Sequence, residues 1–171
     1  MDELTKLRAA GPGDEPFLRK MMYEAAAWNP DWPHEEVIEA LSNPVLARYV
    51  DGWRRPGDAG VIAEREGEAI GAAWYRLFTA DAPGYGFVDE RTPELGLAVV
   101  PLYRRHGVGT ALLDALIDRG RDDGYPALSL SVAPSNRSRL MYERAGFQKV
   151  GELGGSWTMR LDLAPGRSSR G

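Results

Sequence analysis

One stretch of this sequence constrains the fold more than any other, because it joins a strand-like segment to a helix-like segment through a basic turn with two glycines. It covers residues 95–113 and reads LGLAVVPLYRRHGVGTALL. Its first part is short and apolar and ends at Pro101, which predicts a buried strand. Its second part repeats apolar residues every three or four positions, which predicts a helix over residues 107–120. The chain therefore has to combine strands and helices around this turn.

The turn has the properties of an anion-binding site. The first turn of a helix presents unpaired N–H groups and a partial positive charge, and Arg104 and Arg105 add two formal charges. Gly107 and Gly109 let a ligand approach the backbone because they have no Cβ atom. A phosphate or pyrophosphate fits such a site, although a helix that merely begins with glycine gives a similar pattern. Neither a G-x-x-x-x-G-K-[ST] sequence nor a third glycine at dinucleotide-binding spacing is present.

The composition excludes several kinds of chemistry. The chain has no Cys and two His, His34 and His106, so a thiol nucleophile, an iron–sulfur cluster and a His-rich metal site are excluded, and we expect no metal. The 171 residues carry a net charge of −4, whereas nucleic-acid binders usually have a basic excess. No apolar signal core and no run of about 18 apolar residues is visible. These features predict a cytoplasmic protein that binds neither nucleic acid nor a membrane.

The rest of the sequence predicts one mixed α/β domain over residues 3–163 and a flexible tail at 164–171. We expect strands at 4–9, 60–65, 69–78, 93–100, 127–132, 147–153 and 156–163, and helices at 14–28, 34–41, 45–53, 107–120 and 136–145. The second and third strands should form a hairpin around Gly67. Because one crossover helix joins the fourth strand to the fifth, these two should be parallel neighbours.

A second motif lies in residues 128–151, LSLSVAPSNRSRLMYERAGFQKVG. With the first motif it resembles the GNAT superfamily of N-acetyltransferases. The family's R/Q-x-x-G-x-G/A pattern after V-x-P is matched by Val99, Pro101, Arg104, Gly107 and Gly109. Its later N…Y-x-x-x-G-F pattern is matched by Asn136, Tyr142, Gly146 and Phe147. The resemblance implies a mixed, mostly antiparallel sheet flanked by helices, with parallel central strands that splay apart.

The resemblance also implies a cofactor site for acetyl-CoA, which would serve as co-substrate without a metal. The strand that pairs with the pantetheine arm would be formed by Leu97, Ala98 and Val99. The pyrophosphate loop, preceded by Arg104, would be formed by Arg105, His106, Gly107, Val108, Gly109 and Thr110. Asn136 would contact the cofactor arm, a role that Ser135 could share because the family often spaces its Asn one residue further from the Tyr.

Two residues are candidates for catalysis by this resemblance. Tyr142 occupies the position where the family places a Tyr beside the thioester sulfur, and the alternative is a Tyr that only packs on its helix. Glu94 is the candidate base, acting through a water, although the family's acidic residue more often lies one residue earlier, at Pro93 here. The alternative for Glu94 is a hydrated carboxylate at a strand end. Asp89 and Glu90 are weaker candidates.

The acceptor side gives a less specific pattern. The segment that lines the acceptor site in the family is rich in aromatic and acidic residues: Tyr23, Trp28, Trp32, Trp53, Asp31, Glu35, Glu36, Glu39 and Asp51. They could form a pocket for a cationic amine, or pack helices beneath a solvated acidic face. Tyr85, in the long loop at 79–92, is a candidate gate.

The predicted function is direct transfer of an acetyl group from acetyl-CoA to a primary amine, with a small-molecule amine favoured over a peptide amine. A homodimer is compatible with this function. The alternatives are a non-catalytic acyl-CoA-binding module of the same fold and, less favoured, a regulatory domain that binds a nucleotide phosphate.

Overall fold

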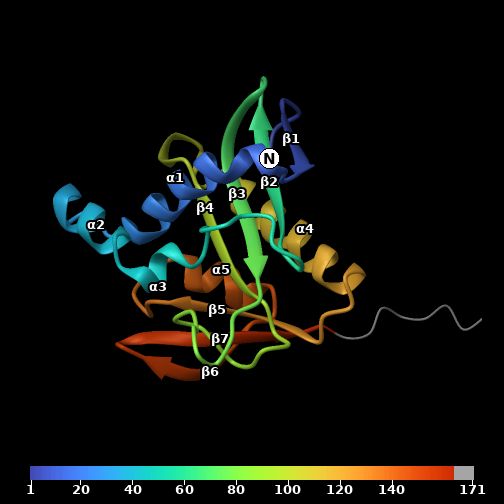
Figure 1. The fold of residues 1–171 in the computed structure, drawn as a ribbon. Helices are drawn as coiled ribbons and strands as arrows, with labels where there is room; N and C mark the ends of the chain where they lie inside the picture. The colour runs from blue at the N-terminus through green and yellow to red at the C-terminus, as the bar shows by residue number, and fades with distance from the viewer. Residues whose placement is uncertain (164–171) are drawn as a thin grey trace, which may run out of the picture.

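Seven strands form one sheet in the spatial order β1-β2-β3-β4-β5-β7-β6 in the computed structural model, which describes residues 1–163 (Figure 1). The predicted tail at 164–171 lies outside the described residues. The strands are β1 (Thr5–Ala9), β2 (Ala59–Arg65), β3 (Glu68–Arg76), β4 (Glu94–Val99), β5 (Ala127–Val132), β6 (Gln148–Leu153) and β7 (Ser156–Asp162). The α-helices are α1 (Glu15–Ala26), α2 (His34–Leu41), α3 (Pro44–Ala47), α4 (Val108–Asp122) and α5 (Ser138–Arg144). All neighbouring strands are antiparallel except β4 and β5, so the predicted fold class is confirmed.

The parallel strands β4 and β5 touch at one end and then separate. Their ladder consists of the pair Glu94↔Ser129, supported by the Ser129 amide donating to the Pro93 carbonyl at 2.9 Å. Beyond this pair, no other pairing between β4 and β5 occurs in residues 1–163. In Figure 1 β5, β6 and β7 run across the direction of β2, β3 and β4. The predicted splay is therefore confirmed, and it opens the sheet beside the N-terminus of α4.

Apolar helix faces cover both sides of the sheet. On one side α4 buries Leu112, Leu113 and Leu116 against β2 and β3. On the other side α1 buries Leu18 and Met21 against β3 and β4. This arrangement follows from the helical spacing of apolar residues, because each stripe can be removed from water only by packing on a sheet face. It leaves the splay between β4 and β5 accessible.

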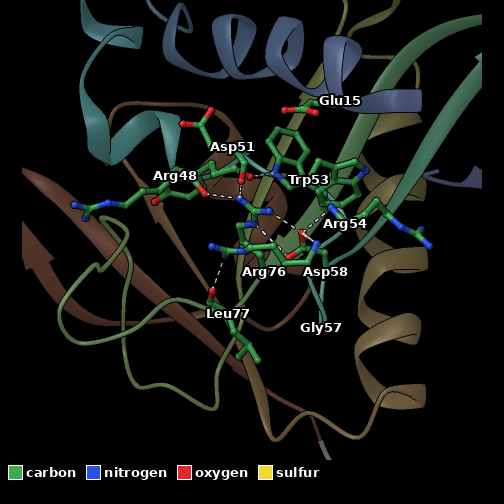
Figure 2. Close-up of polar contacts among 12 residues, drawn as sticks. Glu15, Arg48, Asp51, Trp53, Arg54, Gly57, Asp58, Arg76 and Leu77 are labelled. Atoms are coloured by element: carbon green, nitrogen blue, oxygen red, sulfur yellow. Dashed lines mark hydrogen bonds and ion pairs between the residues drawn. The ribbon is translucent and has the colours of Figure 1, made fainter. Parts of the chain in front are cut away.

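The helix predicted at residues 45–53 is wrong beyond its first turn. The α3 helix covers Pro44–Ala47, and the chain then turns through Gly52, whose φ is +66°. The physical reason is Arg76, a fully buried residue of β3. Its Nη1 atom donates to the carbonyls of Arg48 and Asp51, both at 2.7 Å (Figure 2). These carbonyls therefore accept hydrogen bonds from a distant side chain and not from a continuing helix.

The same arginine forms a buried ion pair. Its Nη2 atom lies 2.7 Å from Asp58 Oδ2, and both side chains are almost completely removed from solvent (Figure 2). Asp58 Oδ2 also accepts from the amides of Arg54 and Arg55. The bonds made by Arg76 tie residues 48–58 to β3, next to the strand that carries Glu94. Among residues 1–163, no helix is both long and apolar enough to cross a membrane.

Candidate active site

A cavity of about 710 Å³ lies in the splay between β4 and β5. It extends from the N-terminus of α4 to the start of β4, with α1 and α5 as further walls. Most residues predicted for the site line it: Glu94, Leu97, Ala98, Val99, Arg104, Arg105, Gly107, Gly109, Thr110, Ser135, Asn136 and Tyr142. Two others do not: the Val108 side chain is buried in the core beneath α4, and His106 is exposed outside the cavity lining. The fold thus brings the two sequence motifs to opposite walls of one cavity.

The turn before α4 has the backbone geometry that its glycine predicts. Gly107 has φ +82° and precedes the first helical residue, Val108, and Arg105 also adopts a positive φ of +64°. Positive φ values at alternate residues turn successive N–H groups inward, which is the geometry of a concave anion site. An added Cβ at Gly109 would meet Met141 Sδ at 3.3 Å, so a side chain here would fill the gap between α4 and α5.

The two arginines of the turn have different surroundings. Arg104 Nε donates to the Val99 carbonyl at 2.9 Å, and Arg104 Nη2 donates to Glu24 Oε2 at 3.0 Å. This arginine therefore connects the end of β4 to α1, and its charge is partly balanced by Glu24. Arg105 is an exposed residue whose side chain makes no ion pair within residues 1–163. Arg105 is the better placed of the two to supply charge to an anion.

Glu94 is a buried carboxylate at the start of β4. It is 2% exposed and lines the cavity, so it is not the hydrated strand-end carboxylate of the alternative interpretation. Oε2 accepts a hydrogen bond from the Tyr49 hydroxyl, and Oε1 is buried without a partner in the described part of the chain. Burial raises the pKa of Glu94 from 4.5 to about 7, against the opposing effects of the Tyr49 hydroxyl and the Gly86 amide. A carboxyl with such a pKa suits general-base catalysis near neutral pH.

Tyr142 lies on α5 and also lines the cavity. Its ring packs edge-to-face on Phe147, with the centroids 5.8 Å apart, and the residue is 6% exposed. Burial raises the pKa of its hydroxyl well above the ordinary 10.0, and within residues 1–163 no hydrogen bond opposes this shift. Tyr142 therefore stays protonated at neutral pH and keeps an O–H donor available to a group in the cavity.

Tyr49 is the site residue that the sequence did not reveal. Its hydroxyl donates to Glu94 and accepts from the Tyr85 amide at 3.0 Å, and the residue lines the cavity. No local pattern marks it, because its partners are 45 and 36 positions away in the sequence. The two weaker acidic candidates have roles in the 79–92 loop: Glu90 accepts from the Ala80 amide, and Asp89 accepts from the Arg91 amide.

The aromatic residues of the predicted acceptor segment fall into two groups. Trp28 and Trp32 stack edge-to-face at 5.3 Å and line a second cavity of about 390 Å³, together with Glu36 of α2. This cavity adjoins the first, since both are lined by Trp28, Leu46, Ser131, Val132 and Asn136. Trp53 instead lies in the core, where its Nε1 donates to the Gly11 carbonyl.

The other predicted acceptor residues lie outside these cavities. The Tyr23 hydroxyl bonds His34 Nδ1 at 2.6 Å, and Asp51 pairs with Arg19 at 2.8 Å. Tyr85 lines the first cavity, as expected for a residue at its edge. In the described part of the chain no group of three His, Asp or Glu residues is arranged to hold a metal ion.

Comparison with known proteins shows the family to which this architecture belongs. The profile of the Acetyltransferase (GNAT) family matches residues 18–147, a span that includes β4, α4 and α5. The chain belongs to the GNAT acetyltransferase family. The resemblance predicted from the two motifs is thereby confirmed, and the splayed sheet is the GNAT fold.

Individual GNAT relatives differ in their acceptors and in their length. A mycothiol acetyltransferase of Propionibacterium freudenreichii subsp. shermanii is 35% identical over 118 residues, which are 68% of this chain but 36% of that protein. The chain thus spans about a third of that relative. An L-methionine sulfoximine/L-methionine sulfone acetyltransferase of Pseudomonas paraeruginosa is 29% identical over 95% of this chain and 97% of that protein. The PaiA N-acetyltransferase of Thermoplasma acidophilum, solved with coenzyme A, shares the fold with a TM-score of 0.70 and 16% identity, over 95% of this chain and 99% of that one.

Proposed function

We propose that this protein is an acetyl-CoA-dependent N-acetyltransferase that transfers the acetyl group directly to a small-molecule primary amine. The observation that carries the proposal is one cavity that combines three groups. Glu94 supplies a carboxylate with a pKa of about 7, Tyr142 supplies an O–H donor, and the glycine turn before α4 supplies backbone N–H groups. Family membership and a relative named for a small amino-acid acceptor agree with this proposal.

The cavity fits coenzyme A as the acetyl donor. The backbone groups of β4 that point toward β5 have no strand partner in residues 1–163 beyond Glu94, so the amide groups of a pantetheine arm can bond them. The pyrophosphate would lie at the amides of residues 105–110, where the helix N-terminus and Arg105 favour negative charge. Asn136 lines the cavity from the opposite wall, although its Oδ1 already accepts from the Ser138 amide at 2.9 Å.

The proposed chemistry is aminolysis of a thioester. An alkylammonium group, with a pKa of about 10, must lose a proton before it can attack. Ionised Glu94 accepts this proton through a water, the amine nitrogen bonds the acetyl carbon, and the C–S bond breaks to release a thiolate. The second proton that the nitrogen loses as the amide forms is taken up by the departing thiolate through solvent, which gives free thiol. Tyr142 then donates a hydrogen bond to the sulfur. Because burial raises the pKa of Tyr142 above its ordinary 10.0, complete proton transfer to a thiolate is unfavourable, and the hydrogen bond is its role.

The second cavity would hold the body of the acceptor. Trp28, Trp32 and Val37 give it an apolar wall, and Glu36 adds a negative charge. An amine with an apolar or aromatic group and a second cationic group fits this lining. Because this cavity adjoins the first beside Ser131 and Asn136, an amine there can extend toward the thioester.

The proposal is tested by turnover with a panel of amines. Purified protein and acetyl-CoA are incubated with amino acids, aromatic amines, polyamines and peptides, and both free thiol and acetylated product are measured. We expect a small amine with an apolar body to react fastest. Acetyl-CoA binding without transfer to any amine would favour the non-catalytic acyl-CoA-binding alternative. Preferential acetylation of peptides would contradict the acceptor class.

Removing the Tyr142 hydroxyl should slow the chemical step. We expect Tyr142→Phe to lower kcat at least about tenfold, because the hydrogen bond acts on charge that develops in the transition state. Affinity for acetyl-CoA should change little, since the ring contact with Phe147 is retained. Rapid-quench kinetics and calorimetry measure the two quantities. A wild-type rate in the variant, with chemistry limiting, would reduce Tyr142 to a packing residue.

Truncating Trp32 should weaken the binding of the acceptor amine but not that of acetyl-CoA. Trp32 is 46% exposed at the rim of the second cavity, so Trp32→Ala removes an aromatic wall without opening the core. We expect KM for the amine to rise several-fold and KM for acetyl-CoA to stay within about twofold. Ile38→Ala is the control, because Ile38 is similarly exposed at 49% on α2 but does not line the cavity. Equal effects of the two variants on KM for the amine would show that the acceptor does not bind in this cavity.

A further inference from the structure

We propose that Tyr49 is a positioning residue that orients the Glu94 carboxylate and couples it to the 79–92 loop, an inference that rests on the proposed role of Glu94 as base. The Tyr49 hydroxyl has two hydrogen-bond partners. It donates its proton to Glu94 Oε2 and accepts a hydrogen bond from the Tyr85 amide at 3.0 Å. This buried hydroxyl therefore donates a hydrogen bond to the carboxylate and accepts one from the loop.

Tyr49 is held rigidly by β3, the strand next to Glu94. Trp74 Nε1 donates to the Tyr49 carbonyl at 2.9 Å. Arg76 donates to the carbonyls of Arg48 and Asp51, on either side of Tyr49 (Figure 2). In the β3–β4 ladder Arg76 lies directly opposite Glu94. Tyr49 and its carboxylate partner are therefore fixed to adjacent strands of one sheet, which limits their relative movement.

The 79–92 loop closes over the same carboxylate. A Cβ atom added at Gly84 would collide with Glu94 Oε1 and would lie 2.9 Å from the Tyr49 hydroxyl oxygen. A Cβ added at Gly86 would lie 2.8 Å from the Ser131 backbone nitrogen. Arg48 Nη1 also holds the loop, because it donates to the Pro83 carbonyl at 3.0 Å. Only a loop with glycine at both positions can approach this closely, and it helps to bury Oε1 from bulk solvent.

The loop and Tyr49 act on the acidity of Glu94 in opposite directions. Burial disfavours the charged carboxylate, whereas a hydrogen bond donated to it favours the charged form. The charged groups on the neighbouring elements are engaged elsewhere: Arg76 pairs with Asp58, and Arg48 bonds the loop. Tyr49 is thus the side chain that keeps part of the Glu94 population ionised at neutral pH, and it does so in the orientation that faces the cavity.

The test is a direct titration of Glu94 in the wild type and in Tyr49→Phe. The side-chain carboxyl is followed by ¹³C NMR of protein labelled at glutamate, and its resonance is assigned by its absence in Glu94→Gln. We expect the pKa of Glu94 to rise by about one unit in Tyr49→Phe, since a donor to the charged form is lost. The acidic limb of the pH–rate profile should move upward by the same amount.

The matched control is Tyr75→Phe. Tyr75 is a buried tyrosine, as Tyr49 is, and it lies on β3. Its hydroxyl donates to the carboxylate of Asp123 at 2.5 Å, outside the cavity. This variant loses the same kind of hydrogen bond but should leave the titration of Glu94 unchanged. An equal shift in both variants would show a general effect on the fold and would overturn the proposal.

A second variant approaches the question from the loop and does not depend on Tyr49→Phe folding. Gly84→Ala places a methyl group against Glu94 Oε1, so the loop must move away and admit water. We expect the pKa of Glu94 to fall toward its ordinary value of 4.5, opposite to the effect of Tyr49→Phe. An unchanged Glu94 titration in either variant overturns the coupling.

The NMR titration and the pH–rate profile together separate this inference from the proposed function. The NMR titration needs no turnover, so it decides the role of Tyr49 even if no amine reacts. If Tyr49→Phe shifts the Glu94 titration but the pH–rate profile does not follow, Glu94 is not the base and the proposed mechanism fails, whereas the coupling stands. If the profile follows Glu94 in the wild type but Tyr49→Phe moves neither, the coupling alone is wrong.

Discussion

Glu94→Gln should lower kcat/KM for the amine by about 10²–10⁴ at pH 8, because the variant cannot accept the proton of the attacking ammonium group. In the wild type, activity should fall as the pH drops below about 7, where protonation of Glu94 removes the base. The variant should lack this acidic limb, and its remaining pH dependence should be that of the amine. Initial rates at saturating acetyl-CoA between pH 5 and 9 measure both effects.

Glu90→Gln is the control for this prediction, since Glu90 is an exposed loop carboxylate whose bond to the Ala80 amide a Gln carbonyl can replace. Its activity and pH profile should match those of the wild type. A wild-type rate in Glu94→Gln, or an acidic limb that persists in it, would contradict the assignment of the base. The reaction would then rely on positioning and on amine that is already deprotonated.

The stability of Glu94→Gln reports the burial of the carboxylate separately from its role in catalysis. The pKa of Glu94 in the fold, about 7, lies above its ordinary 4.5, so folding favours the protonated form. The resulting stabilisation is complete below about pH 4.5 and is lost as the pH rises through 7. Glu94→Gln, which stays neutral, should therefore gain stability relative to the wild type between pH 5 and 8 in urea unfolding.

Gly109→Glu should reduce the affinity for acetyl-CoA at least about 100-fold. The substitution places a carboxylate in the first turn of α4, where the pyrophosphate is expected, and like charges at such distances repel strongly in a partly buried site. It also fills the space in front of Met141. Isothermal titration calorimetry with acetyl-CoA measures the change.

Two further variants separate charge from bulk in this prediction. Gly109→Ala adds a methyl group 3.3 Å from the flexible Met141 side chain, so we expect a much smaller loss. Gly13→Glu makes the same change of charge where a Cβ meets nothing within 4 Å, and it should bind like the wild type. If Gly109→Glu binds acetyl-CoA as tightly as the wild type, the assignment of the pyrophosphate to the α4 turn is wrong.

Local sequence patterns were sufficient for most of the fold. The alternation in β7 and the helical spacing in α4 each report which face is buried, so element types and order could be derived from neighbours in the chain. The exception was the segment after α3. There the local pattern favours a helix, but the Arg76 guanidinium donates hydrogen bonds to the carbonyls of Arg48 and Asp51, which lie 28 and 25 positions away in the sequence.

In the candidate site too, some features follow from the local sequence and others depend on the tertiary structure. The sequence by itself determined the backbone of the turn before α4, because glycines and a helix start within a few residues are sufficient to form it, and it indicated Tyr142 through a motif. It could not distinguish a hydrated Glu94 from a buried one, since that depends on Tyr49 and on the 79–92 loop. Nor could it separate Trp28 and Trp32, at a cavity, from Trp53, in the core. Burial and the acidity of a side chain depend on groups distant in sequence, so the tertiary structure was required to establish them.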